Sequence, residues 1–272
     1  MNASLDANSS AQPTPEYIDI GGRRLRHVVH RGTGDAVVLV HGFGSSLDTW
    51  ALNLVAFAAG GRTVAALDLP AHGESARQLD SGSLEELSSI VLAYMDTMGI
   101  ASAHLVGHSM GAAICLLLAD QAGARVKSLT LVGPAGLGQT INRDFIGGFI
   151  AATDREQLQS AMRLLFARED SLTPQLLEHT LRYKRTEGVS EALAKIAGSR
   201  FRGTSSGGQL RDVVGRVPTL IIWGAQDAIM PPPDPAAFAG DNVRFHVLPG
   251  SGHMVQIEAA AEVNRLIDAF LG

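Results

Sequence analysis

The sequence has one cysteine, no long hydrophobic run and no excess of positive charge, and each shortage excludes a class of protein. Cys115 has no second cysteine to pair with, so an internal disulfide is excluded and a reducing, cytoplasmic location is expected. No apolar stretch reaches the roughly eighteen residues that a membrane span needs. Lys and Arg number 22 against 27 Asp and Glu, without a basic stripe, so neither nucleic acid nor a membrane is an expected partner.

Apolar residues are plentiful, at 46% of 272 residues, which is enough material for one well-buried core. The polar segment at residues 1–16 lacks the positive start and the apolar run of a signal peptide, and we interpret it as a disordered tail. The composition therefore favours one domain that binds a small molecule.

Short apolar runs alternate with longer helical segments through most of the chain. Gly21-Gly22 separates two strand-like segments and suits the tight turn of a hairpin. The later runs are apolar on both faces, which is typical of a parallel sheet covered by helices. The predicted strands are 17–20, 25–29, 36–40, 63–67, 104–106, 128–132, 219–223 and 245–248.

Capping signals place two of the core helices. Ser83 and Glu86 form an S-x-x-E capping box before an apolar residue pattern of helical spacing, and Gly99 is suited to end that helix. Apolar residues from Val255 to Phe270 predict one C-terminal helix that closes the sheet.

Residues 137–215 interrupt the alternation because they contain no convincing strand. Helix starts are predicted at Thr153-x-x-Glu156 and at Thr173-Pro174, and residues 203–208 resemble a flexible link. The fold class is therefore α/β, with a sheet core formed by residues 17–136 and 216–272. We interpret 137–215 as a helical lid over the sheet edge where open α/β sheets bind ligands, although extra packing is the alternative.

The pentapeptide GHSMG at residues 107–111 matches the G-x-S-x-G pattern. It lies directly after an apolar strand and before a helix rich in small residues, which is the context that a nucleophilic serine needs. The glycines let neighbouring backbone approach a strained turn that exposes the Ser109 hydroxyl. The sequence therefore predicts Ser109 as a nucleophile, whereas the buried helical setting of Cys115 argues against that role for the thiol.

A serine nucleophile needs a base and an acid, in the chain order serine, acid, histidine. His253 follows the last strand on a glycine-rich loop, whereas His179 lies in a predicted lid helix and His246 inside a strand. Asp227 comes directly after a strand, and Asp234 lies farther along behind a run of prolines. The carboxyl ends of parallel strands meet at one edge, so we predict a Ser109–His253–Asp227 triad.

The HGFG segment at residues 41–44 follows the first predicted parallel strand. The backbone N–H groups of Phe43 and Met110 are the predicted oxyanion hole, and His41 is expected to shape the loop. The histidine in the segment 68–75 has no metal-ligand spacing, so we interpret that segment as a loop supporting the site, and no metal is predicted.

The motifs VLVHGFG, LDLPAHGES, LVGHSMGA, WGAQD and GSGHM resemble the successive motifs of the α/β-hydrolase superfamily, over nearly the whole chain after Pro15. The resemblance implies a mostly parallel sheet with helices on both faces. The segments 134–138, 141–147 and 181–185 are similar to the hydrolase-like domain of the acetyltransferase component of bacterial acetoin dehydrogenase systems. Those relatives carry an N-terminal lipoyl domain, whereas only the short polar tail precedes the hydrolase part here, so no lipoyl module is expected.

The carbon–carbon bond hydrolases of aromatic degradation are also related. They typically have Asn before the nucleophile and Trp after the base, where this sequence has His108 and Met254. The leading hypothesis is hydrolysis of a small ester or thioester through an acyl-Ser109 intermediate, with no cofactor. An acyltransferase, a carbon–carbon bond hydrolase and a non-catalytic ligand-binding protein remain the alternatives, and the oligomeric state is undetermined.

Apolar residues of the lid recur at roughly helical spacing, and some of them are expected to line the substrate pocket. Phe149 and Met162 are the predicted substrate-binding residues. Packing of one lid helix against another is the alternative. The residues are Phe145, Phe149, Leu158, Met162, Leu165 and Phe166.

Overall fold

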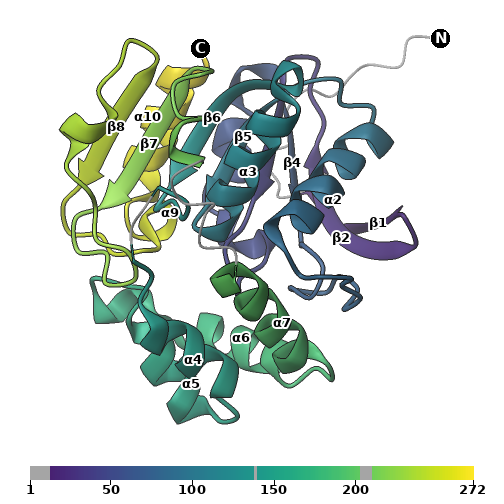
Figure 1. Cartoon of the computed structure of the whole chain (residues 1–272), viewed down its shortest axis with the longest axis vertical. Helices are drawn as coiled ribbons and strands as arrows, with labels where there is room; N and C mark the ends of the chain where they lie inside the picture. The colour runs from purple at the N-terminus through teal and green to yellow at the C-terminus, as the bar shows by residue number, and fades with distance from the viewer. Residues whose placement is uncertain (1–12, 138–139, 203–209) are drawn as a thin grey trace.

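The computed structural model describes residues 13–137, 140–202 and 210–272. Its centre is an eight-stranded sheet in the order β1-β2-β4-β3-β5-β6-β7-β8, with helices on both faces and a helical layer at one end (Figure 1). The predicted fold class is confirmed. The strands are β1 Glu16–Ile20, β2 Arg23–His30, β3 Ala36–Val40, β4 Thr63–Leu67, β5 Ala103–His108, β6 Val126–Val132, β7 Thr219–Gly224 and β8 Val243–Leu248.

The first two strands form the predicted hairpin, and the other strands run parallel to one another. β1 pairs with β2, and β2 with β4, in antiparallel register. Gly21 and Gly22 have φ angles of 60° and 80°, the left-handed region that glycine adopts without steric cost. Residues 1–12 of the predicted tail lie outside the described residues, and its last residue, Glu16, already pairs with His27.

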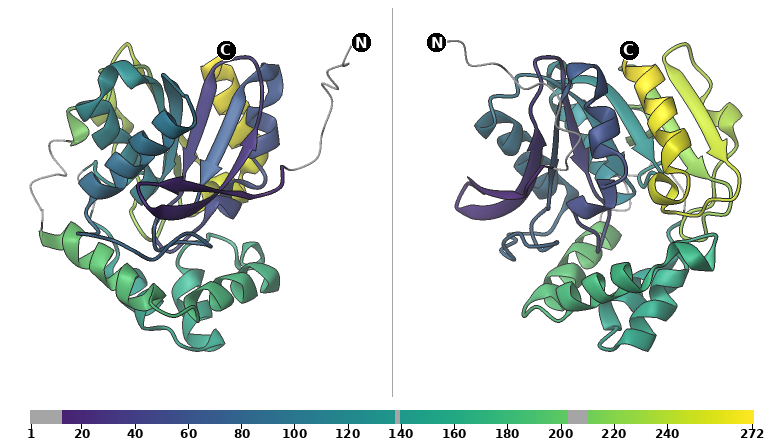
Figure 2. Two further views of the ribbon diagram at one scale, coloured as in Figure 1. Left: turned by 90° about the vertical axis from the view of Figure 1, so that its right-hand side faces the viewer. Right: turned by 180° about the vertical axis from the view of Figure 1, so that it is seen from behind.

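Alternating side chains of the strands fill two separate apolar layers. Val38 and Val40 pack in the layer that contains α2 and α3, while Val37 and Leu39 pack in the layer that contains α1 and α10. The two views in Figure 2 show helices covering each face of the sheet. Both faces of the sheet are therefore covered by apolar layers, as the apolar strand sequences predict. The core helices are α1 Leu54–Phe57, α2 Leu84–Thr97, α3 Met110–Gln121, α9 Val255–Glu258 and α10 Ala260–Leu271.

The N-terminus of α2 is capped differently from a standard capping box. The Ser83 side chain accepts from the backbone N–H of Glu86, as predicted. The Glu86 carboxylate, however, accepts from the N–H groups of Asp80, Ser81 and Gly82, and not from that of Ser83. The three donors precede the capping-box motif in the sequence. The motif alone therefore does not predict their contacts with this carboxylate.

The predicted C-terminal helix is two helices in the structure. Ala259 has φ −124° and ψ 38°, which breaks the helix between α9 and α10. The buried residues Val255, Val263 and Ile267 still lie in one apolar layer, so the pattern was informative although the single helix was wrong.

In the described part of the chain between β6 and β7, four helices form the layer at the end of the sheet, and we call them the cap. Thr173 caps α6 with Pro174 at its first position, as predicted. For α5 the capping residue is Asp154 instead of Thr153, because Asp154 accepts from the N–H of Gln157. The predicted link at 203–208 lies outside the described residues. The cap helices are α4 Arg143–Ala151, α5 Arg155–Arg163, α6 Pro174–Lys184 and α7 Val189–Arg202.

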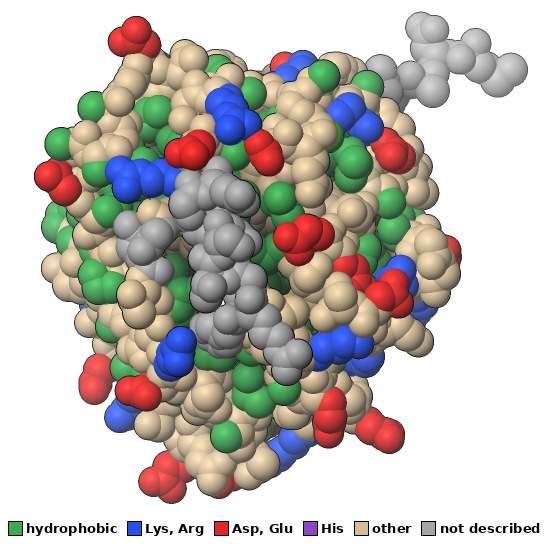
Figure 3. Space-filling model, in the orientation of Figure 1, with side chains coloured by type: hydrophobic (Ala, Val, Ile, Leu, Met, Phe, Trp, Pro, Cys, Tyr) green, Lys and Arg blue, Asp and Glu red, His purple; other side chains and the backbone are tan. Residues whose placement is uncertain are grey.

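No helix in the described ranges is long and apolar enough to cross a membrane. Charged side chains of both signs are scattered over the face of the molecule seen in Figure 3. Cys115 is buried inside α3, where burial raises the pKa of its thiol.

Candidate active site

Ser109 lies on a strained turn between β5 and α3. Its φ of 53° and ψ of −116° fall outside the regions that a side chain ordinarily allows. A Cβ on Gly107 would lie 2.5 Å from the carbonyl oxygen of Gly111, and a Cβ on Gly111 would lie 2.2 Å from that of Val40. The two glycines of the motif are therefore required by close backbone contacts. Strain of this kind costs about 1–3 kcal/mol and is typical of functional sites.

Asp227 and His253 form a buried pair on the same edge of the sheet. The Nδ1 atom of His253 lies 2.8 Å from Oδ2 of Asp227, and the two side chains are 2% and 0% exposed. Asp227 follows β7 and His253 follows β8, so the parallel strands bring together residues that are 26 positions apart. An Nδ1–H that donates to the carboxylate leaves Nε2 of His253 able to accept a proton.

The Asp227 carboxylate is held in place by three further donors. Oδ1 accepts from the backbone N–H groups of Ile229 and Met230 at 2.8 and 2.9 Å, and Oδ2 accepts from Nε1 of Trp223 at 3.1 Å. These bonds compensate for the loss of water around a buried carboxylate. Asp234, the other acid considered from the sequence, is exposed and caps a short helical turn, where it accepts from the N–H of Ala236.

His108 braces the loop that carries His253. Its Nε2 lies 3.0 Å from the carbonyl oxygen of His253, and the two rings are 4.8 Å apart. Burial, followed by the neighbouring His253, lowers the pKa of His108 well below its ordinary value. His108 is therefore neutral and donates Nε2–H to the carbonyl. The position of His108 next to Ser109 was the only indication of this contact in the sequence.

The two predicted oxyanion-hole residues lie on either side of Ser109. Met110 begins α3, and Phe43 follows Gly42, whose Cβ would lie 3.1 Å from the Cβ of Ser109. Within the described residues, the backbone N–H groups of Phe43 and Met110 have no hydrogen-bond acceptor. Free donors beside a nucleophile are the arrangement that stabilises a developing oxyanion.

Two buried histidines hold the loop that carries Phe43. His41 accepts from the N–H of Leu69 through Nε2 and donates through Nδ1 to the carbonyl of Gly42. The His72 ring packs 4.9 Å from that of His41. Burial lowers the pKa of His41 to about 4 and that of His72 to about 3, so both are neutral near pH 7.

Asp68 ties the loop after β4 to the loop after β3. Its carboxylate accepts from the N–H of Leu47 at 2.7 Å and from that of Glu74 at 2.9 Å. A Cβ on Gly73 would lie 2.0 Å from Asp68 Oδ2, so glycine is required there. These contacts agree with the interpretation of the segment 68–75 as a loop that supports the site. No group of three potential metal ligands occurs within the described ranges.

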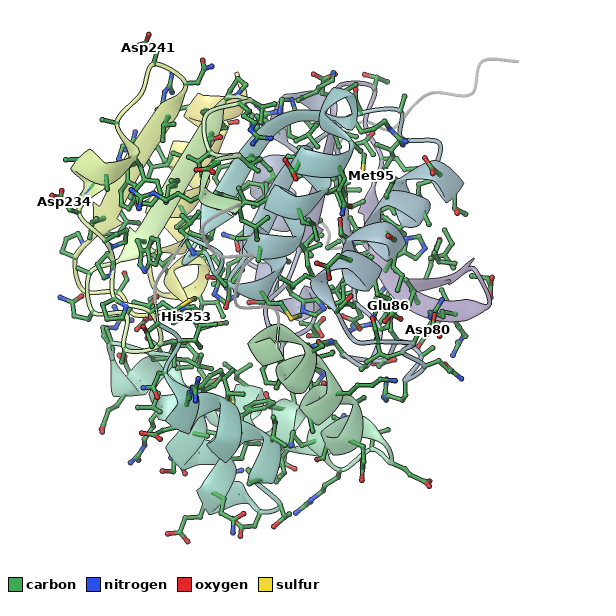
Figure 4. All side chains as sticks on the ribbon, in the orientation of Figure 1. Asp80, Glu86, Met95, Asp234, Asp241 and His253 are labelled. Atoms are coloured by element: carbon green, nitrogen blue, oxygen red, sulfur yellow. The ribbon has the colours of Figure 1, made fainter. Side chains whose placement is uncertain are left out.

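A cavity of about 100 Å³ lies between the sheet edge and the cap, and Ser109 and His253 both line it. Figure 4 labels His253 at this boundary. Of the predicted lid residues, all but Leu158 contribute to the wall, and Leu158 is buried elsewhere in the apolar core. The apolar lining residues are Phe43, Phe145, Phe149, Met162, Leu165, Phe166, Leu176, Met254 and Ile257.

The cavity also has polar lining residues that sequence reasoning missed. Asp48 and Thr49 come from the turn after the HGFG loop, and His179, Thr180 and Tyr183 come from cap helix α6. The position of His179 in a predicted lid helix argued against its being the base, and no other role was predicted for it. Its position on the same face of α6 as the other two, at helical spacing, was the available signal.

Known proteins resemble this chain in sequence and in structure. The chain is 47% identical to a dihydrolipoyllysine-residue acetyltransferase component of the acetoin cleaving system from Pseudomonas putida, over 97% of this chain and 71% of that one. It is 29% identical to a 2-hydroxy-6-oxononadienedioate/2-hydroxy-6-oxononatrienedioate hydrolase from Paraburkholderia phymatum, over 95% and 96%. A crystal structure of a meta-cleavage product hydrolase superposes with a TM-score of 0.84 at 23% identity, over 94% and 97% of the two chains.

The family model of the alpha/beta hydrolase fold matches residues 35–260, which include the strained serine turn, the Asp227–His253 pair and the whole cap. The chain therefore belongs to the α/β-hydrolase family.

Proposed function

We propose that this protein cleaves a small carboxylic ester or thioester through an acyl-Ser109 intermediate. The observation that carries the proposal is the buried Asp227–His253 hydrogen bond, which lies at the same cavity as the strained serine turn. A serine hydroxyl is a weak nucleophile near neutral pH, and a neutral imidazole oriented by a carboxylate is the base that activates it.

The proposed reaction proceeds in two half-reactions. Nε2 of His253 takes the proton as Oγ of Ser109 attacks the carbonyl carbon, and the N–H groups of Phe43 and Met110 stabilise the oxyanion. The intermediate then collapses, the imidazolium gives its proton to the leaving alcohol or thiol, and the acyl group stays on Ser109. Water enters, His253 removes its proton, and a second tetrahedral intermediate releases the carboxylic acid and free Ser109.

The cavity wall supports a small, mainly apolar substrate. Phe149 and Met162, the proposed substrate-binding residues, are 2% and 4% exposed and line the cavity. Apolar walls with a few polar anchors are typical of small-molecule sites. Asp48 places a carboxylate in the wall, and no Lys or Arg occurs among the described lining residues. A dicarboxylate such as the relative's dienedioate would therefore meet a like charge here, which disfavours that carbon–carbon bond cleavage.

Acyl transfer to a thiol is the second candidate function. It is favoured by the 47% identity to a protein named as a dihydrolipoyllysine-residue acetyltransferase component. The two functions share the acyl-Ser109 intermediate and differ only in whether water or a thiol attacks it. A dihydrolipoyl thiol would receive the acyl group while His253 accepts the thiol proton.

Fluorophosphonate labelling tests the shared step. We expect the intact protein to gain one phosphonyl group, which peptide mass spectrometry places on Ser109, and Ser109→Ala to gain none. An unlabelled Ser109 would overturn the proposal and favour a non-catalytic ligand-binding protein.

Product analysis separates the two candidates. The protein is given a short-chain acyl thioester with and without dihydrolipoamide, and free acid and acyl-dihydrolipoamide are quantified. Free acid as the main product supports hydrolysis, whereas acyl-dihydrolipoamide formed in preference to acid supports transfer.

A further inference from the structure

One end of the cavity wall is built from charged and polar groups of the core and the cap. Asp48 belongs to the short turn after β3, and His179 belongs to cap helix α6, so this end of the cavity lies where core and cap meet. Nε2 of His179 lies 3.9 Å from Oδ2 of Asp48. That separation is too long for a direct hydrogen bond.

The Asp48 carboxylate is held rigidly from its protein side. Arg26 donates to both carboxylate oxygens, at 2.9 and 3.0 Å, and Ser46 donates its hydroxyl to Oδ2 at 3.0 Å. The Arg26 side chain is 10% exposed and also contacts Asp68 at 3.4 Å. A bidentate pair of this kind fixes both position and orientation. The carboxylate is nonetheless 40% exposed and lines the cavity, and three hydrogen bonds leave one of its roughly four acceptor positions, on Oδ1, for a ligand.

The charge around Asp48 does not cancel. Arg26 contributes one positive charge, and the carboxylates of Asp48, Asp68 and Glu74 surround it, the last at 4.0 Å. Although partial burial alone would raise the pKa of Asp48, the hydrogen bonds and charge of Arg26 bring that pKa below its ordinary value. Asp48 is therefore an anion that accepts hydrogen bonds and repels substrate carboxylates.

The pair favours a group that both donates and accepts hydrogen bonds. An oxygen atom placed between the Asp48 carboxylate and His179 Nε2 can make a hydrogen bond of normal length to each side chain. Asp48 can only accept, whereas His179 can donate from Nε2. A hydroxyl does both, because it donates to the carboxylate and accepts from the imidazole. An ammonium group could bind only by donating to both side chains, which requires the His179 tautomer that lacks the Nε2 proton, and an ether cannot donate to Asp48.

We infer that Asp48 and His179 form a subsite for a hydroxyl group of the substrate, on either the acyl part or the leaving part. This inference rests on the proposed ester or thioester cleavage at Ser109. It narrows the substrate class from simple apolar esters to hydroxylated ones whose remaining surface contacts the apolar wall.

The test measures kcat/KM for matched pairs of substrates. In the first series, acetyl thioesters of mercaptoalkanols with two to four carbons are compared with those of alkanethiols in which a methyl group replaces the hydroxyl. In the second series, hydroxyacyl phenyl esters are compared with alkanoyl esters of the same length. We expect at least one hydroxylated substrate to be preferred about tenfold, the value of one hydrogen bond to a charged group.

Two variants and a control test whether Asp48 and His179 cause the hydroxyl preference. His179→Phe keeps a ring but removes both nitrogens, and Asp48→Asn keeps the shape but removes the charge. Each should bring the hydroxyl preference to within about twofold of unity. Asp48→Asn also weakens the Arg26 contact, so its folding is checked by thermal melting, while His179→Phe leaves that ion pair intact. Gln175→Ala, an exposed change on the same helix, should keep the preference.

The outcomes distinguish this inference from the proposed function. If the wild-type protein cleaves none of the esters and thioesters, the proposed function fails. If it cleaves them without a hydroxyl preference in either series, or if the preference survives in both variants, the subsite is overturned. Faster cleavage of a trimethylammonium thioester than of the hydroxylated one would replace the hydroxyl subsite with a cation site.

Discussion

The edge of the sheet and the cap meet at one cavity, but different forces position their side chains. At the sheet edge, Ser109, Asp227 and His253 follow the ends of parallel strands, and backbone N–H groups hold the Asp227 carboxylate. In the cap, Phe149 and Met162 are placed by side-chain packing.

Polar contacts at several places tie the cap and its connecting segments to the core. The Tyr183 hydroxyl donates to the carbonyl of Ala71, and Glu258 accepts from the N–H groups of Ala167 and Arg168. Backbone-held groups tolerate little displacement, whereas packed apolar groups can be exchanged for others of similar volume. On the proposed function, we therefore expect substitutions at the sheet edge to change the rate most and substitutions in the cap to change mainly the acyl-chain preference.

The largest expected effect is at the sheet edge. Ser109→Ala and His253→Ala should each lower kcat by about 10⁴-fold or more, because either change disables the same attacking unit. The double variant should be no slower than the slower single variant. Steady-state ester or thioester cleavage measures this, with circular dichroism to verify folding. Roughly multiplicative losses would show that one of the two residues is wrongly assigned.

Asp227→Asn should lower kcat by about 10³–10⁴-fold, because an amide favours the wrong imidazole tautomer. It should also cost about 1–3 kcal/mol of unfolding free energy, since the amide nitrogen cannot accept from the donors around Asp227. Asp234→Asn is the matched control at an exposed site, with less than about 0.5 kcal/mol expected. Normal turnover in Asp227→Asn together with slow turnover in Asp234→Asn would show that Asp234, and not Asp227, is the acid that orients His253.

Mild acid should destabilise the sheet-edge loops. His41, His72 and His108 are buried, and burial lowers the pKa of each, to about 4 for His41 and to about 3 for His72. Exposed imidazoles in the unfolded chain take up protons near pH 6.5. At these three positions the unfolded chain therefore binds up to three more protons than the folded protein. The stability that the three neutral histidines contribute above pH 6.5 is lost as the pH falls toward 4.

Asp68 acts in the opposite direction. Burial raises its pKa to about 6, so the folded protein keeps a proton that the unfolded chain releases near pH 3.8. The stability that the Asp68 proton contributes is fully present below pH 3.8 and is lost as the pH rises through 6. This proton, bound only by the folded protein, offsets about one of the three protons that the histidines bind only in the unfolded chain. Urea unfolding from pH 4.5 to 8 measures the net slope. His72→Gln should reduce that slope by about 1.4 kcal/mol per pH unit between pH 6.5 and 4, and an unchanged slope would contradict the assignment.

The smallest expected effect is in the cap. Phe149→Leu should shift the acyl-chain preference of ester cleavage toward longer chains by a few fold, because the ring lines the cavity. Since Phe149 is only 2% exposed, the variant should also lose about 1–1.5 kcal/mol of stability. Pocket lining and cap packing are therefore not exclusive roles for this residue.

Leu158→Ala is the control for the cap, because Leu158 is buried but does not line the cavity. It should cost about 2–5 kcal/mol while the chain-length preference stays fixed. A preference that shifts in Leu158→Ala as much as in Phe149→Leu would show that the cap responds as a whole, and the assignment of individual wall residues would then be wrong.

The sequence by itself predicted the fold class, the strands and the group of residues at the sheet edge. These predictions rest on local signals, because a strand that is buried on both faces is apolar throughout and the carboxyl ends of parallel strands meet. Ser109, Asp227 and His253 each follow a parallel strand within a few residues. The residue pattern around each of these three residues was therefore enough to predict that all three lie at the carboxyl edge of the sheet.

Only the tertiary structure decided the break at Ala259, the contacts of Glu86 and the Asp48–His179 pair. Asp48 and His179 are far apart in the sequence and lie on different layers of the molecule, so no periodic pattern links them. Their proximity depends on how α6 packs over the loop after β3, which many side chains determine together. Local pattern therefore predicted which residues gather at the sheet edge, whereas packing between distant segments determined the polar end of the cavity.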